Sequence, residues 1–142
     1  MKGRRTKKER LADDAEYQEF PKPKLDPSNP LIDVAQTIAE NWVDKDGATV
    51  KDYAKAIREA TSWSLSLAAA VMESDEKNIN WENVRTAMYN LFGVSARANY
   101  KAMALLDSEY VVPSDEDQAA QLKVYVDTQF YMIQAEKRRQ KL

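Results

Sequence analysis

The sequence predicts an all-α fold, and three observations support this class. Only 3 glycines and 5 prolines occur in 142 residues, fewer turn residues than an all-β fold of this length would need. Hydrophobic residues make up 44% of the chain and charged residues 31%, so there is enough apolar material for a core. Beyond residue 30, apolar residues recur at steps of three and four, which is the period of a helix that packs on one face. We expect a helical bundle of four main helices, over residues 30–43, 49–73, 80–107 and 113–141.

The first two expected helices each begin at a recognisable cap. Asn29 and Pro30 suit the N-cap and the first helical position of the helix over 30–43, which stops before Gly47. Thr49, with Asp52 three residues later, forms an approximate capping box for the helix over 49–73. The apolar residues of this second segment keep a helical period over about six turns.

The helix predicted over 80–107 contains Gly93 in its middle. Asn80 is its expected N-cap, and the phase of the apolar face continues across Gly93, which lies on the opposite side. We therefore favour one long helix. The alternative is a break at Gly93, with Ser95 as a new N-cap.

The last helix, opened by Pro113 and Ser114, is apolar on two sides. Its main stripe is expected to be buried and comprises Ala119, Leu122, Val126, Phe130 and Ile133. Val124 and Tyr131 lie opposite this stripe, and a helix that is apolar on two sides usually has two neighbours. We therefore expect Val124 and Tyr131 to form an oligomer interface, whereas the alternative is that they are scattered surface residues. Acidic residues in the first turn and basic residues in the last complement the helix dipole, which accounts for the C-terminal basic run.

The net charge of -2 hides a strong asymmetry along the chain. Residues 1–10 carry six basic side chains and one acidic, whereas residues 11–135 carry 11 basic and 21 acidic. Four of the five prolines lie in residues 20–30, so no helix runs through this segment. We therefore divide the chain into a basic arm (1–19), an extended Pro-rich linker (20–30) and a helical domain (31–142).

The basic arm is the first candidate for binding nucleic acid. Its cations are Lys2, Arg4, Arg5, Lys7, Lys8 and Arg10. No aromatic residue is interleaved with them, so the arm would bind phosphate charge and would not read bases. The alternative partner is an acidic protein surface, including the acidic body of a neighbouring subunit.

A basic stripe in the helix over 49–73 is the second candidate. Lys51, Lys55 and Arg58 fall within about 60° of one another on the helical wheel, away from the apolar face. In a helix-turn-helix this second helix would contact DNA. The alternative is a solvated helix face, because Asp52 and Glu59 flank the stripe and would repel phosphates.

The absence of cysteine and histidine excludes several classes of function. It removes disulfides, Cys or His zinc sites, cysteine nucleophiles and histidine-based triads. The acidic runs 44–46 and 115–117 are best explained as a turn and a helix N-terminus. We therefore expect no enzyme, no cofactor and no metal. No run of 18 apolar residues and no secretory signal occurs, so we also expect no membrane partner and a cytoplasmic location, in a cell or a virus-infected one.

The layout of a basic arm, helices and no catalytic residues is similar to that of small terminase subunits of tailed phages, which form rings that bind viral DNA. This resemblance implies a non-enzymatic, oligomeric protein that binds nucleic acid during genome packaging. The alternative is a structural protein of a virus particle, either scaffolding, adaptor or virion-associated, that uses its arm on a protein partner. Either protein would be found in the host cytoplasm or the virion.

Overall fold

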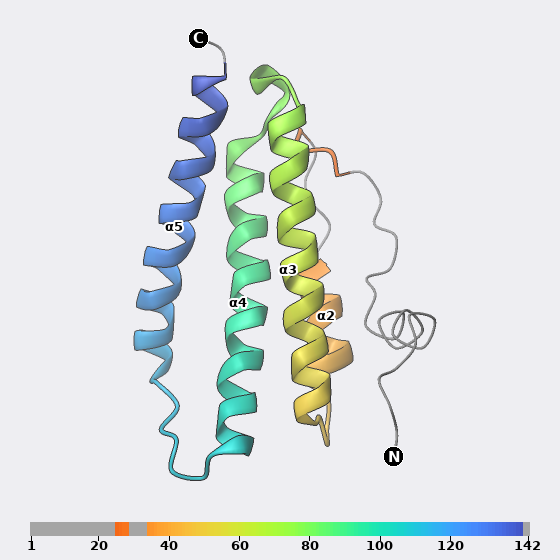
Figure 1. The fold of residues 1–142 in the computed structure, drawn as a ribbon, viewed down its shortest axis with the longest axis vertical. Helices are drawn as coiled ribbons and strands as arrows, with labels where there is room; N and C mark the ends of the chain where they lie inside the picture. The colour runs from red at the N-terminus through yellow and green to blue at the C-terminus, as the bar shows by residue number, and fades with distance from the viewer. Residues whose placement is uncertain (1–24, 29–33, 141–142) are drawn as a thin grey trace, which may run out of the picture.

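The computed structural model describes residues 25–28 and 34–140. These residues contain four α-helices, one 3₁₀ turn and no strand, so the all-α class is confirmed (Figure 1). The elements are α2 (Val34–Trp42), α3 (Val50–Glu73), η1 (Glu76–Asn78), α4 (Trp81–Leu106) and α5 (Asp115–Arg139). The predicted arm, most of the linker and the expected caps Asn29 and Pro30 lie outside the described residues.

The predicted caps of α3, α4 and α5 are present. Thr49 and Asp52 form the full capping box of α3, with the Thr49 N–H donating to Asp52 Oδ2 at 2.9 Å. The Asn80 side chain accepts from the backbone N–H at the start of α4. Ser114 caps α5, which therefore begins at Asp115 instead of at Pro113. Gly47 has a φ of 71°, a conformation that favours glycine and allows the turn before α3.

α4 runs through Gly93 as one helix, so the long-helix prediction is confirmed and the break at Ser95 is not found. A Cβ atom built at Gly93 would meet Leu122 Cδ2 at 3.5 Å, which is an ordinary van der Waals contact. Neither the backbone conformation at this position nor the space beside it therefore requires glycine.

Replacing Gly93 with alanine should raise the free energy of unfolding by about 0.5–1 kcal/mol. The added methyl group fits, and alanine restricts the unfolded chain more than glycine does. Urea denaturation followed by circular dichroism would measure the change. Gly47→Ala is the matched control and should lower stability by about 1 kcal/mol, because its φ is positive. A loss of stability in Gly93→Ala would mean that Leu122 cannot accept the methyl group.

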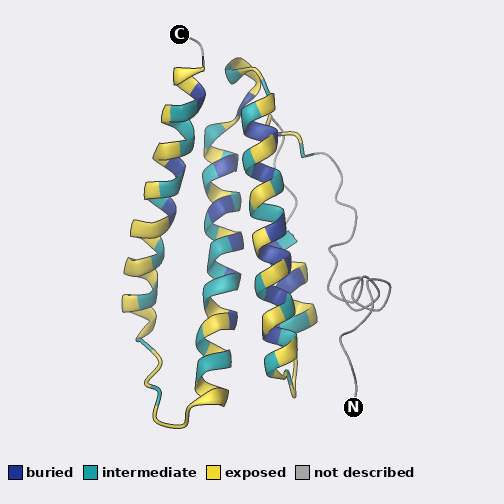
Figure 2. Cartoon of the chain, viewed as in Figure 1, coloured by how far each residue is buried: buried dark blue, intermediate teal, exposed yellow. Residues whose placement is uncertain are grey.

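The helices bury two apolar clusters, one toward each end of the molecule (Figure 2). The first lies among α2, α3 and α4 and is rich in small residues, so these helices approach one another closely; Ala56, Ala60 and Ala98 are at most 1% exposed. The second lies among α3, α4 and the part of α5 that follows Leu122, where Val126 and Phe130 are buried. The core therefore holds α5 mainly by its C-terminal half.

One residue predicted on the buried stripe of the last helix, Ala119 near the start of α5, is exposed. The reason is that α5 lies farther from α4 toward its N-terminus (Figure 1), where Ala119 lines a pocket of about 500 Å³ among α2, α4 and α5. Helical phase alone predicts a face, but the tilt between two helices decides how much of that face is covered.

A short part of the predicted linker contacts the helices. Leu25 packs against the second cluster, and Pro27 is buried. The Pro27 carbonyl accepts a hydrogen bond of 2.8 Å from the Asn80 N–H at the start of α4. Across the described ranges, none of the helices has the length and hydropathy needed to cross a bilayer.

Candidate functional site

The arm, the first nucleic-acid candidate, lies outside the described residues. This applies to all six of its predicted contacts, Lys2, Arg4, Arg5, Lys7, Lys8 and Arg10. The structure therefore bears on the basic stripe of α3, on the predicted oligomer interface of α5 and on the surfaces between the helices.

The basic stripe occupies the N-terminal half of α3. Lys51 and Arg58 are exposed, whereas Lys55 is partly buried and its Nζ lies 5.8 Å from the centre of the Trp42 ring. The two acidic residues predicted to repel phosphates are both engaged in other ways. Asp52 caps α3 and pairs with a lysine of the preceding turn at 3.2 Å, and Glu59 is buried.

The arrangement of α2 and α3 departs from a helix-turn-helix in one respect. Seven residues separate the two helices, compared with the three or four of that motif. The same half of α3 that carries the stripe also packs against both α2 and α4 through Tyr53, Ala56 and Ala60. The stripe therefore lies on the flank of a core helix, and this geometry favours the solvated-face alternative.

Asp127 is the centre of a polar cluster that joins α5 to α4. Its Oδ1 accepts from Arg85 Nη2 and from Tyr89 Oη, each at 2.7 Å, and its Oδ2 accepts from Lys123 Nζ at 2.7 Å. The hydrogen bonds from Lys123 and then Tyr89 hold the pKa of the Asp127 carboxyl well below its usual range. Sequence analysis did not single out this cluster, because only the Lys123–Asp127 spacing of four residues is visible in one helix.

Asparagine at position 127 should reduce the acid sensitivity of the protein. A carboxyl whose pKa is lowered on folding stabilises the folded state above its unfolded pKa, near 3.8, and this contribution disappears as pH falls through the folded value. Melting temperatures measured from pH 6 to pH 2 should therefore fall less steeply for Asp127→Asn than for the wild type. Asp46→Asn, at an exposed turn position, is the control. Equal slopes in the wild type and Asp127→Asn would contradict the assignment.

Both residues of the predicted oligomer interface are exposed on α5. Val124 is 69% exposed and Tyr131 is 55% exposed. The Tyr131 ring lies 6.0 Å from the Arg85 guanidinium and makes an edge contact with the Phe130 ring. One side of the Tyr131 ring therefore packs against these two residues, while the rest of the ring is exposed. The helical phase thus placed these two side chains correctly on the surface.

The C-terminal basic run lies in the last turn of α5, as predicted, and it also contacts α3. Lys137 is buried, and its Nζ donates to the Met72 carbonyl in the last turn of α3 at 2.8 Å. Arg138 pairs with Glu76 of η1 at 3.5 Å. A cation at a helix C-terminus is favourable to the dipole, so this run stabilises two helices. The contact with α3 could not be predicted from the sequence because the residues are far apart in the chain.

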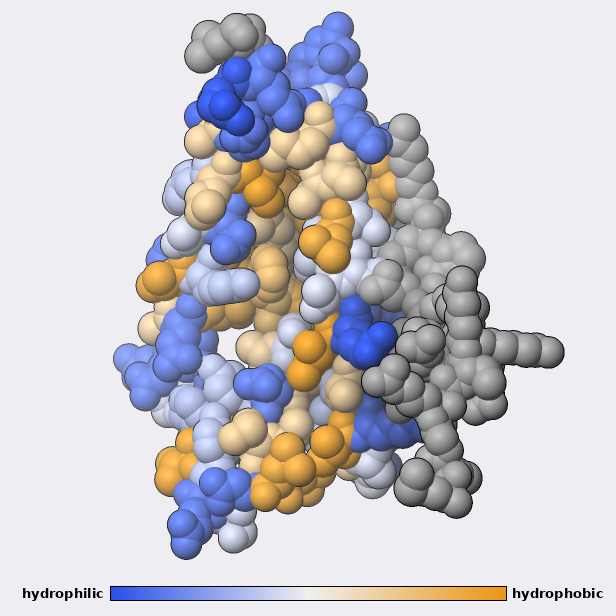
Figure 3. All heavy atoms as spheres, in the orientation of Figure 1, coloured by the Kyte–Doolittle hydropathy of each residue, from blue (hydrophilic) through white to orange (hydrophobic). Residues whose placement is uncertain are grey.

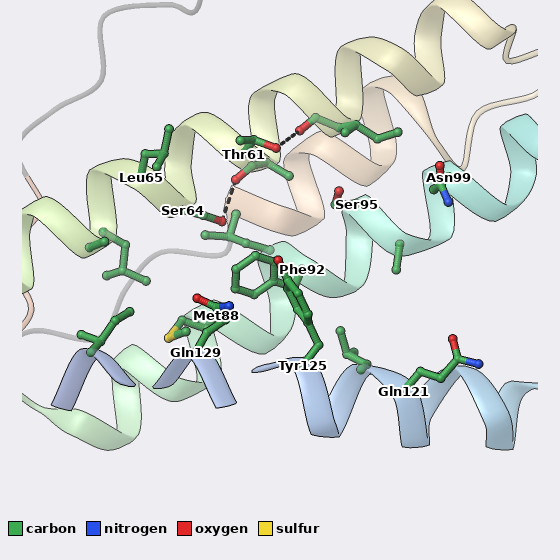
Figure 4. Close-up of a pocket in the computed structure, with 18 of the residues that line it drawn as sticks. Thr61, Ser64, Leu65, Met88, Phe92, Ser95, Asn99, Gln121, Tyr125 and Gln129 are labelled. Carbon is green, nitrogen blue, oxygen red and sulfur yellow. Dashed lines mark hydrogen bonds between the residues drawn. The ribbon is translucent and has the colours of Figure 1, made fainter. Parts of the chain in front are cut away.

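A groove of about 730 Å³ lies between α3 and α5, with α4 as its floor (Figure 4). Leu65 of α3 and Tyr125 of α5 lie at its two sides, and Phe92 and Ser95 of α4 lie in its floor. The Phe92 and Tyr125 rings meet edge to face, with centres 5.1 Å apart. Mainly neutral and hydrophobic colours fill this hollow in the space-filling view (Figure 3). Of the 22 residues that line the groove none is charged, in a chain that is 31% charged.

The described part of the chain is thus an all-helical protein with an uncharged groove and an exposed apolar face on its last helix. Within it, no three or more metal-ligating side chains are grouped so that they could hold an ion. The chain matches no known protein family, no curated protein and no solved structure.

Proposed function

We propose that the chain is a non-enzymatic, oligomeric helical protein that binds nucleic acid through its N-terminal arm, in viral genome packaging. The observation that carries this proposal is the distribution of charge. Residues 1–10 carry six basic side chains and one acidic, whereas residues 34–140 carry 12 basic and 16 acidic. The positive charge that attracts phosphate is therefore concentrated in the arm.

The ion pairs of the helical body support this assignment. Seven of its cations lie within 4 Å of carboxylates of the same chain: Lys45, Arg85, Arg97, Lys101, Lys123, Arg138 and Arg139. Lys137 is buried against α3. A cation already paired with a carboxylate attracts phosphate less strongly, so the body adds little to nucleic-acid affinity. The arm is the better source of contacts, ahead of the stripe on α3.

Oligomerisation would strengthen binding by such an arm. A single arm with six cations gives a weak, salt-sensitive, sequence-independent interaction. Several arms on one assembly bind the same duplex with a high effective concentration, so the affinity of the assembly exceeds that of one chain. The exposed Val124 and Tyr131 on α5 offer the apolar surface for this assembly.

Light scattering at low and high salt, with and without duplex DNA, tests the proposal. We expect an oligomer at both salt concentrations, with DNA bound only at low salt, because phosphate contacts are screened while apolar contacts are not. A monomer that takes up no DNA at any salt concentration would refute it.

The uncharged groove favours a second candidate, a structural protein of a virus particle that binds only protein. In that case the arm would bind the acidic body of a neighbouring subunit. The same experiment separates the two functions, because a purely structural protein would form an oligomer that never takes up DNA. Its mass would also fall when residues 1–10 are removed.

A further inference from the structure

We propose that the groove between α3, α4 and α5 receives the outer face of α5 from a second copy of this chain. Copies would then join head to tail. The inference rests on the oligomeric state in the proposed function, and it names the two surfaces that meet.

The groove has the character of the central part of a protein interface. Such regions are depleted in charge and rich in apolar side chains, and here none of the 22 lining residues is charged and 13 are apolar. Along α3 the lining runs from Ile57 to Val71, a length of about 21 Å. The hydroxyls of Thr61 and Ser64 already donate to carbonyls of their own helix at 2.8 Å, so a dry partner would leave neither donor unsatisfied (Figure 4).

The outer face of α5 has the matching chemistry and length. Its members are exposed, uncharged and spaced by three or four residues: Ala120, Val124, Thr128, Tyr131 and Ala135. This outer strip is about 22 Å long, close to the groove length along α3. Nine of the 25 residues of α5 are charged, yet none belongs to the strip. The Thr128 hydroxyl donates to the Val124 carbonyl at 2.7 Å, so a partner can cover this hydroxyl without leaving its donor unsatisfied.

The fit between these surfaces favours a second copy over an unrelated helix. Small residues in the groove, including Ser64, Ala68, Ser95 and Ala96, leave room for protruding side chains. Val124 and Tyr131 are large and protrude from the strip, at 69% and 55% exposure. The small residues of the groove and the two large residues of the strip are complementary in shape, and both surfaces occur on the same chain.

The geometry of α5 allows the contact to be made head to tail. Tyr125 lies at the side of the groove, whereas Val124 belongs to the outer strip, so α5 uses different faces for the two roles. One copy can therefore receive a neighbour in its groove while it inserts its strip into another. Contacts of this kind produce a closed ring when the rotation closes and a filament when it does not.

Cysteine cross-linking of the full-length protein tests the contact, because the natural chain has no cysteine. Val124→Cys marks the strip, Ser95→Cys marks the groove, and Thr37→Cys, exposed on α2, is the control. Each variant carries one thiol, and pairs are mixed and treated with a short bis-maleimide. We expect covalent dimers when Val124→Cys and Ser95→Cys are mixed, at least ten times more than in mixtures with Thr37→Cys. Dimers formed by Val124→Cys alone, or yields equal to the control, would overturn the proposal.

A charge on the strip gives a second, independent measurement. Val124→Asp should reduce the mass in solution to that of a monomer, because a carboxylate would have to enter an uncharged groove. Thr37→Asp should leave the mass unchanged, and circular dichroism should show the same helix content in both. If the Val124→Asp variant still forms the oligomer and still binds DNA, this contact is refuted and the proposed function stands. A wild-type monomer that binds no DNA would refute both.

Discussion

Deletion of residues 1–10 should remove most of the salt dependence of DNA binding. If the six cations of the arm each contact one phosphate, the logarithm of the binding constant falls with the logarithm of salt concentration with a slope of about -5. Wild-type affinity should therefore drop by roughly a thousandfold between 50 and 200 mM salt. The deletion variant should lose this dependence, and its affinity at 50 mM should be lower by a similar factor. Fluorescence anisotropy with a labelled duplex at several salt concentrations would measure both.

Substitution of the α3 stripe separates the two candidate DNA surfaces. Replacing Lys51, Lys55 and Arg58 with alanine should change the slope little if the arm supplies the contacts. If the stripe binds phosphate, the slope should shrink by about three units, at about 0.9 for each contact. A deletion variant that keeps the full wild-type slope would contradict the arm assignment.

Alanine at position 130 should lower the free energy of unfolding by about 3–5 kcal/mol, the usual cost of removing a buried phenylalanine. Phe130 is 5% exposed, and its ring meets the Trp81 ring edge to face, with centres 5.9 Å apart. The Arg85 guanidinium lies 5.6 Å from the same ring, so the Asp127 cluster is also disturbed. Few residues of α5 are buried, so the substitution removes one of the main contacts that hold α5 against α3 and α4.

Urea denaturation would measure the effect, and Val124→Ala on the same helix is the matched control. Val124 is exposed, so its truncation should change stability by less than about 0.5 kcal/mol in the isolated chain. If Phe130→Ala detaches α5 alone, the denaturant dependence should also become shallower, because less surface remains to be exposed on unfolding. Equal stability of the two variants would mean that Phe130 does not anchor α5.

Local signals in the sequence predicted the helices well. Thr49, Asn80 and Ser114 each cap a helix through a side chain only three residues from its partner, so these contacts are readable from the sequence. The phase of α5 likewise predicted that Val124 and Tyr131 lie outside the core. The basic stripe on α3 was also placed correctly, although its role stays a prediction.

The features that depend on packing between helices could not be predicted. Asp127 meets Arg85 and Tyr89 across 42 and 38 residues of chain, and no periodicity relates them. Lys137 reaches Met72 across 65 residues. The groove and the exposure of Ala119 depend on the tilt of α5 against α4, which is decided by which side chains meet and not by the pattern within either helix.

The division of the core into two clusters gives α5 unequal anchorage along its length. From Leu122 onward its inner face packs in the second cluster, whereas its first two turns border a pocket and follow an exposed connection. Amide hydrogens in the first half of α5 are therefore expected to exchange faster, through local unfolding of low free energy. Those in the second half should exchange more slowly, because their exposure requires unfolding of a larger region at a higher free energy. We therefore expect the angle between α5 and α4 to vary more at the N-terminal end of α5 than at its C-terminal end.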